Sequence, residues 1–304
     1  MPNRRKFEHA HLRVPDLDES LSFYRDILGL EELSRENGVV RLAMEPETHY
    51  DLIDHHFTLA LEEGDGGLEH FAIRVTEAEL ESIQSRLDDK DVEYEILEAA
   101  EPGQIRTIRT ELPGGLPMEL TAVEKRADPD REEVLSPPPN QHSPKGPDHI
   151  TLASPDVKED TEFLRDVLEF KVSDVMVAGP DTWGMAFTRW GDHHHDVAII
   201  MDPTTQQTGL HHIAWQMTEM NHMKQFVDVL GKAGHEVEID FTRHPLGNNV
   251  SLYFSDPAGN RQEITTEVTS LDQDTPTTYH RGNPDDIVTF WKGTHPSLGG
   301  ESDH

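Results

Sequence analysis

Five residues in the second half of the chain have the types and spacing needed to bind a metal and handle oxygen. His149 stands in Asp-His-Ile-Thr-Leu and His212 in Gly-Leu-His-His-Ile-Ala-Trp. A later segment holds His244, then Tyr253, then Glu263. Two imidazoles and one carboxylate form the 2-His-1-carboxylate triad, which leaves metal positions open and suits non-haem Fe(II) that reacts with O₂.

The spacing of the three ligands does not by itself establish a metal site. Taken singly, His149 and His212 also fit hydrogen-bonded core histidines beside strands, and Glu263 fits a solvated strand residue. A turn predicted at Asp-Pro-Ala-Gly, just before Glu263, would fold the segment back so that its polar residues converge. A glutamate buried beside two histidines needs a cation to offset its charge. Both interpretations stay open at this point.

Internal repetition predicts the architecture that must position these residues. The two halves align with an offset that grows only from 140 to 144 residues, pairing 9–16 with 149–156, 23–28 with 163–168, 69–72 with 211–214 and 115–119 with 259–263. The chain is therefore a tandem duplication.

Each half divides again into two similar units. In the first half, Asp16 can cap an amphipathic helix over 16–28 that follows a strand at 7–14. A second helix is expected over 76–87. The remaining strands of this half are expected near 38–44, 57–61, 71–75, 93–97, 104–111 and 117–122. This pattern predicts an α+β protein of four βαβββ units.

Composition and the repeat together predict the domain boundaries. A polar, proline-rich stretch over 125–147 favours an extended linker. It separates an N-terminal module, residues 1–124, from a C-terminal catalytic module, residues 148–270. The tail, 271–304, gathers apolar residues at Ile287, Val288, Phe290 and Trp291, which predicts packing on a module or on a partner subunit.

The charge and residue usage exclude several classes of function. The 304 residues include no cysteine, so any metal must be held by histidine and carboxylate. A net charge of −33 argues against binding to nucleic acid or to an anionic membrane. Acidic residues are spread over the whole chain, which predicts a surface adapted to high salt and a halophilic source. Without a signal peptide or an apolar run of membrane-spanning length, a soluble, cytoplasmic protein is expected.

The segment from His244 to Glu263 resembles the signature of type I extradiol ring-cleavage dioxygenases, iron enzymes of the vicinal oxygen chelate superfamily. The resemblance covers roughly residues 6–270 and points to a catechol 2,3-dioxygenase-like enzyme. It implies two tandem half-open barrel modules, the glyoxalase/bleomycin-resistance/extradiol dioxygenase fold, with the metal in the C-terminal module. The implied cofactor is Fe(II), with Mn(II) as an alternative, and the implied assembly is a homo-oligomer.

The resemblance also implies a role for each of the five residues. His149, His212 and Glu263 fall on the metal-ligand positions. His244 and Tyr253 fall on positions that hydrogen-bond to a catecholate oxygen, which would favour its charged form and orient the ring.

An acid–base histidine is implied within the run from His193 to His195. We favour His195 because it directly precedes Asp-Val-Ala, as in the family. The spacing to the next ligand is longer than in most relatives, so His193 and His194 remain alternatives. A surface loop rich in histidine is the structural interpretation of the same run.

In the N-terminal module, His9, His70 and Glu119 occupy the positions equivalent to the three ligands. The family usually has a degenerate N-terminal site. Ala100 and Arg109 stand where the second module has His244 and Tyr253, so neither group that would contact a catecholate is supplied. We expect a relic of the duplication, and the sequence leaves open whether a second metal binds.

These observations favour Fe(II)-dependent extradiol cleavage of catechol or an alkylcatechol to a 2-hydroxymuconate semialdehyde, in aromatic degradation. A carboxylated substrate is disfavoured because only Arg243 and Arg281 could meet its charge. The alternative is a glyoxalase-type metal-dependent isomerase or lyase that works without O₂. A third hypothesis, a small-molecule binding protein of the bleomycin-resistance type, gives no reason to keep a triad.

Overall fold

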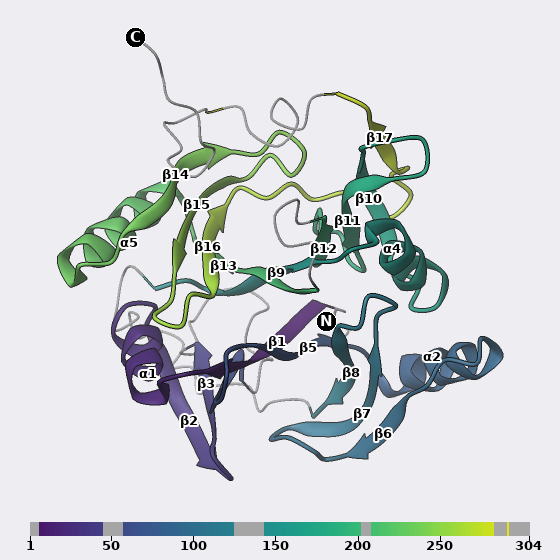
Figure 1. Ribbon diagram of the computed structural model, residues 1–304, viewed down its shortest axis with the longest axis horizontal. Helices are drawn as coiled ribbons and strands as arrows, with labels where there is room; N and C mark the ends of the chain where they lie inside the picture. The colour runs from purple at the N-terminus through teal and green to yellow at the C-terminus, as the bar shows by residue number, and fades with distance from the viewer. Residues whose placement is uncertain (1–5, 45–56, 125–142, 202–207, 283–290, 292–304) are drawn as a thin grey trace.

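Two curved β-sheets, one from each half of the chain, form the framework of the computed structural model (Figure 1). The structure describes residues 6–44, 57–124, 143–201, 208–282 and 291. Each half consists of two βαβββ units. This confirms the α+β class and the tandem modules predicted from the repeat.

The N-terminal module carries an eight-stranded sheet with the order β2-β3-β4-β1-β5-β8-β7-β6. Its first unit contains β1 (Lys6–Val14), α1 (Leu17–Asp26), β2 (Leu30–Glu36), β3 (Val39–Met44) and β4 (Leu59–Glu63). Its second unit contains β5 (Gly67–Arg74), α2 (Glu77–Asp89), β6 (Glu95–Glu98), β7 (Gln104–Glu111) and β8 (Pro117–Val123).

The C-terminal module carries a nine-stranded sheet with the order β14-β15-β16-β13-β9-β12-β11-β10-β17. Its first unit contains β9 (Gly146–Ala153), α4 (Val157–Asp166), β10 (Lys171–Val177), β11 (Trp183–Arg189) and β12 (Val197–Ile200). Its second unit contains β13 (Gly209–Gln216), α5 (Met220–Ala233), β14 (Val237–Arg243), β15 (Val250–Ser255) and β16 (Arg261–Thr266).

Local sequence explains where the helices begin. The Asp16 side chain accepts a hydrogen bond from the backbone N–H of Glu19, as predicted for the cap of α1. Asp156 caps α4 through the same contact three residues on, so the repeat extends to the capping residue. Thr76 and Glu79 form a reciprocal capping box at the start of α2.

One strand, β2, was absent from the predicted elements. Most of its residues are exposed or half-buried, and its sequence is dominated by charge, so no apolar alternation marks it. It pairs with β3 through a tight turn at Asn37 and Gly38, both of which have positive φ. An Asn-Gly pair between two strands is a strong hairpin signal, so the turn residues did carry the information.

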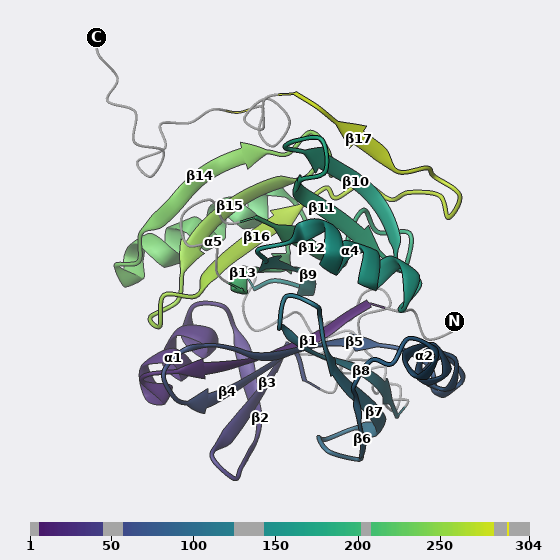
Figure 2. The same cartoon turned by 45° about the vertical axis from the view of Figure 1, so that its right-hand side comes forward.

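The two modules pack against each other through their central strands. Strand β1 contacts β9, and β5 contacts β13 (Figure 2). Helix α1 also reaches the second module, where the Tyr24 hydroxyl donates to Asp256 Oδ2 at 2.7 Å in a buried site. On the other side, the Gly114 N–H donates to Asp160 Oδ1 at 2.7 Å. Strands β9 and β13, which carry His149 and His212, therefore lie at the contact between the modules.

The tail contributes a strand that the sequence did not indicate. Strand β17 (Thr278–His280) pairs in parallel with β10 at the edge of the C-terminal sheet. Of the apolar tail cluster, Ile287, Val288 and Phe290 lie outside the described residues, as do 125–142 of the expected linker. The domain boundaries stay a prediction. No helix in the described ranges is long and apolar enough to cross a membrane.

The contact at Gly114 provides a test of the packing between modules. A Cβ at this position would lie 2.7 Å from Asp160 Oδ2 and 3.1 Å from Ser154 Oγ. Gly114→Ala should therefore lower the free energy of unfolding by about 1–3 kcal/mol, as overpacking does. In the control Gly231→Ala, the new Cβ meets nothing within 4 Å on a helix, so stability should stay or rise by up to about 1 kcal/mol. Equal urea midpoints for both variants would contradict the predicted clash.

Candidate metal centre

Three adjacent strands bring the predicted ligands together. His149 lies on β9, His212 on β13 and Glu263 on β16, and these strands are neighbours in the sheet. In the register, His212 pairs with Thr151 and Glu263 pairs with Ala214. Residues far apart in sequence thus become neighbours because parallel and antiparallel pairing meet at β13.

The donor atoms of the three residues face a common point. The two imidazole Nε2 atoms, of His149 and His212, are 3.3 Å apart. Glu263 Oε2 lies 2.9 Å from His212 Nε2 and 3.4 Å from His149 Nε2. All three side chains are buried, and the Glu263 side chain is only 1% exposed. Two nitrogens and one oxygen in this arrangement match the donor set expected for Fe(II) or Mn(II).

A bulge in β9 adds a partner that sequence reasoning missed. The register with β13 shifts between Ile213 and Trp215, opposite the segment that contains Asp148 and His149. There His149 Nδ1 donates to Asp148 Oδ1 at 2.6 Å, and His193 Nε2 donates to the same oxygen at 3.1 Å. A carboxylate on the far ring nitrogen fixes the ring and directs Nε2 toward the other two donor atoms.

The electrostatics of the centre favour positive charge between the donors. Burial acts against a charged imidazole, but hydrogen bonds to Asp148 and Glu263 outweigh it and raise the pKa of His149 to about 9. Burial likewise acts to raise the pKa of Glu263, yet its contacts with both histidines hold the pKa well below its usual range. Burial dominates at His212 and lowers its pKa. An ionised glutamate therefore faces a site that attracts a cation.

The Glu263 oxygen that does not face the imidazoles, Oε1, has a hydrogen-bond partner of its own. The Ser251 hydroxyl donates to Glu263 Oε1, while Asn249 Nδ2 donates to Ser251 Oγ at 2.8 Å. These side chains are buried. Because Ser251 occupies Oε1, Oε2 is left pointing at the two imidazoles. Ser251 lies inside the signature segment, but nothing in its residue type indicated this role.

The predicted pair His244 and Tyr253 is brought together beside the centre. His244 Nε2 lies 2.9 Å from the Tyr253 hydroxyl, within hydrogen-bond distance. Tyr253 pairs with Glu263 across β15 and β16. Burial, reinforced by the Glu263 charge, raises the pKa of Tyr253 well above its ordinary value. The phenol therefore stays a hydrogen-bond donor next to the ligands.

The three histidines at 193–195 point in different directions. The His195 ring packs on the His149 ring, with centroids 4.0 Å apart. His193 contacts Asp148, behind the ligand. His194 Nε2 donates to Asp174 Oδ2 at 2.8 Å, and its Nδ1 lies 2.9 Å from His195 Nδ1. Among the three, only His195 packs directly on a ligand ring.

The flanking aromatic residues separate into two environments. Phe187 lies beside His195, with ring centroids 5.1 Å apart, and is half-buried. Trp190 stacks on Phe170 at 4.5 Å and belongs to the core. Arg243 donates a hydrogen bond to Asn248.

A family model matches both modules of the chain. The model described as the Glyoxalase/Bleomycin resistance protein/Dioxygenase superfamily matches residues 6–111 and 146–264, one segment in each module. The chain belongs to this superfamily. The expectation drawn from the signature segment is thereby confirmed at the level of the superfamily.

Relatives within the superfamily include extradiol dioxygenases. The manganese-dependent 2,3-dihydroxybiphenyl 1,2-dioxygenase of Geobacillus genomosp. 3 is 28% identical over 272 residues, 85% of this chain and 84% of the relative. The crystal structure of the 2,3-dioxygenase LapB from Pseudomonas sp. KL28 superposes with a TM-score of 0.80 at 26% identity, covering 90% of this chain and 96% of that one.

A superfamily structure of another activity is equally similar in shape. The Mn(II)-bound glyoxalase from Novosphingobium aromaticivorans gives a TM-score of 0.80 at 25% identity, covering 98% of this chain and 94% of that one. Fold similarity therefore does not separate ring cleavage from glyoxalase chemistry, and the site residues must do so. The manganese-dependent relative and the Mn(II)-bound neighbour agree with the expected choice of Fe(II) or Mn(II).

Ser251 offers a test of the metal centre that leaves all three ligands in place. Ser251→Ala removes the donor on Glu263 Oε1 and frees the carboxylate to rotate, so Mn(II) affinity should fall about 10–100-fold, as for other residues that support ligands. Ser255→Ala, at the exposed end of the same strand, is the matched control and should bind as wild type. Unchanged affinity in Ser251→Ala, measured by titration of the metal-free protein, would show that Ser251 does not support a ligand.

Proposed function

We propose that this superfamily member is an extradiol ring-cleavage dioxygenase acting on catechol or an alkylcatechol. The ring would open at the carbon–carbon bond beside the two hydroxyls, and both atoms of O₂ would enter the product, a 2-hydroxymuconate semialdehyde. One observation carries this proposal. The buried triad is contacted by Tyr253, which lies within hydrogen-bond distance of His244, and by His195 from a different element.

The donor set fits Fe(II) or Mn(II), which His149, His212 and Glu263 would hold. When bound, the metal would supply Lewis acidity toward the catechol oxygens and a binding position for O₂. The protein supplies the orientation of the ligands. Asp148 holds the His149 ring through Nδ1, and Ser251 holds the Glu263 carboxylate through Oε1. Holding both reactants in one place removes much of the entropic barrier to their reaction.

Tyr253 and His244 would bind one catechol oxygen. The phenol remains protonated, because its pKa is raised by burial and by Glu263, so it can donate a hydrogen bond to an anionic oxygen. His244 contacts the phenol from the other side and orients it. Hydrogen bonds to the charged form of the substrate favour that form.

His195 would move the proton. Burial lowers the pKa of His195 well below its ordinary value, reinforced by the neighbouring imidazoles of His149 and His194. The ring is therefore neutral and can accept the proton of a catechol hydroxyl. His194 contacts Nδ1, which leaves Nε2 as the nitrogen for this transfer. The same proton is then available to an oxygen of the reaction intermediate.

The surroundings support a catechol without a carboxylate. Phe187 places an apolar ring beside His195, and the Arg243 guanidinium is engaged by Asn248. The glyoxalase-type alternative needs only a Lewis-acidic metal and leaves the Tyr253–His244 pair without a role. A homo-oligomer and a cytoplasmic, high-salt setting remain predictions from the sequence.

Oxygen consumption tests the activity directly. The metal-free protein is loaded with Fe(II), and in parallel with Mn(II), without air in high potassium salt, and then given catechol and air. We expect one O₂ consumed for each catechol and a yellow ring-fission product. Glu263→Gln should abolish both, while Glu236→Gln, an exposed glutamate of the same module, should not. Bound metal without O₂ uptake on several catechols would reject ring cleavage and favour the glyoxalase-type alternative.

The assignment of the acid–base histidine gives a separate prediction. His195→Gln should lower kcat about 100-fold or more, the usual contribution of a positioned proton carrier, with metal content unchanged. His194→Gln should lower kcat less, because both nitrogens of the His194 ring contact protein groups, His195 and Asp174, and neither is left for the substrate. His222→Gln on helix α5 serves as the control. A larger loss of kcat in His194→Gln than in His195→Gln would transfer the role to His194.

A further inference from the structure

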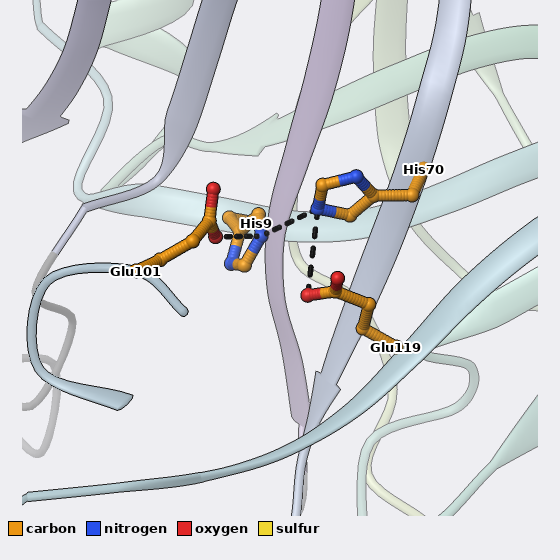
Figure 3. Close-up of side chains that lie close together, drawn as sticks. All are labelled: His9, His70, Glu101 and Glu119. Atoms are coloured by element: carbon orange, nitrogen blue, oxygen red, sulfur yellow. Dashed lines mark hydrogen bonds and ion pairs between the residues drawn. The ribbon is translucent and has the colours of Figure 1, made fainter. Parts of the chain in front are cut away.

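A second set of four metal-binding side chains converges in the N-terminal module. His9 Nε2 and His70 Nε2 are 3.2 Å apart, His70 Nε2 lies 3.5 Å from Glu119 Oε2, and His9 Nε2 lies 3.2 Å from Glu101 Oε2 (Figure 3). All these donor atoms lie within 4.8 Å of one another. We propose that His9, His70, Glu101 and Glu119 bind a second divalent first-row metal ion.

The backbone places three of these residues as it places the C-terminal triad. Glu119 pairs with Ala72 between β8 and β5, just as Glu263 pairs with Ala214 between β16 and β13. The distance between the paired imidazole nitrogens is 3.2 Å in one module and 3.3 Å in the other. The duplication has therefore preserved the positions of the donors as well as their identity.

The cluster contains a buried polar atom without a hydrogen-bond partner, which a cation would satisfy. Glu119 is fully buried, and its Oε2 has no hydrogen-bond partner among the described residues, although it faces His70 Nε2. A buried carboxylate oxygen without a partner destabilises the folded state, because it has lost its hydrogen bonds to water and gained none in return. The two facing Nε2 atoms of His9 and His70 can share at most one hydrogen bond. A metal ion would satisfy all of these atoms at once.

In both Glu119 and Glu101, one carboxylate oxygen contacts an arginine and the other faces an imidazole. Arg109 donates to Glu119 Oε1, leaving Oε2 toward His70. Arg41 Nη2 contacts Glu101 Oε1 at 3.4 Å, while Oε2 faces His9 and also accepts a hydrogen bond from Gln104 Nε2 at 3.2 Å. In the other module, Ser251 likewise contacts Oε1 of Glu263, and Oε2 faces the two imidazoles. The arginines orient the ligands, but their charges also repel a cation, so we expect weaker binding here than at the C-terminal triad.

The residues around this second site do not support ring cleavage. Arg109 pairs with Glu119 in the register where Tyr253 pairs with Glu263. Phe57 packs on His9 with centroids 4.3 Å apart, in the place of His195 on His149. A fourth protein donor, Glu101, also fills a position that the triad leaves open. Two nitrogens and two carboxylates make a closed, structural site for an ion such as Mn(II) or Zn(II).

Counting Mn(II) ions tests this site without any assay of activity. Metal-free protein is titrated with Mn(II), and free Mn(II) is followed by its electron paramagnetic resonance signal. High potassium chloride screens binding to the acidic surface. We expect two ions per chain in the wild type, one in Glu263→Gln, one in Glu101→Gln, and none in the double variant Glu101→Gln/Glu263→Gln. The ion kept by Glu263→Gln should bind more weakly than the ion kept by Glu101→Gln.

Two controls keep the outcome decisive. Glu95→Gln changes an exposed glutamate of the same module and should keep both ions. Adding Mn(II) to Glu263→Gln should raise its melting temperature, because an ion that binds only the folded state stabilises it. One ion per chain in the wild type and none in Glu263→Gln would overturn the second site. So would an ion that persists in the double variant, provided that its circular dichroism is that of the wild type.

Discussion

A buried carboxylate that faces two imidazoles is the interaction on which this structure depends. Removing a glutamate from water costs several kcal/mol unless opposite charge and hydrogen bonds replace the solvent. Glu263 receives both, from Ser251 on one oxygen and from His149 and His212 on the other. The order β16-β13-β9 supplies this arrangement, because it places the strands of Glu263 and His149 on either side of the strand of His212.

Duplication produced this arrangement twice, and the surrounding residues then diverged. The strand registers around Glu119 and Glu263 are the same, whereas the neighbours at corresponding positions are an arginine and a tyrosine. In the N-terminal module the cationic Arg109 contacts one oxygen of Glu119, whereas in the C-terminal module the uncharged Tyr253 stands opposite Glu263. The two clusters share two histidines and one glutamate, so the chemical difference between the modules resides in Glu101 and in the side chains that contact these three residues.

The sequence was sufficient to predict the repeat, the four units and the convergence of the ligand triad, because these depend on local periodicity and on equivalence between the halves. It did not indicate Asp148 as a partner of His149, since successive strand residues normally face opposite sides and only the bulge brings these two together. Glu101 was missed because it lies in a turn between β6 and β7, with no metal-binding counterpart in the second half. Such contacts depend on tertiary geometry that periodicity does not encode.

Packing between the modules helps to hold the ligand strands in register. All eight residues of β9 are buried, and β9 contacts β1 of the other module. A shift of one residue in β9 would turn its apolar side chains away from the core and move His149 away from Glu263. Strand β1 carries His9 under the same constraint. Strands β1 and β9 therefore stabilise each other's register. The N-terminal module thus has a structural role whether or not it performs chemistry.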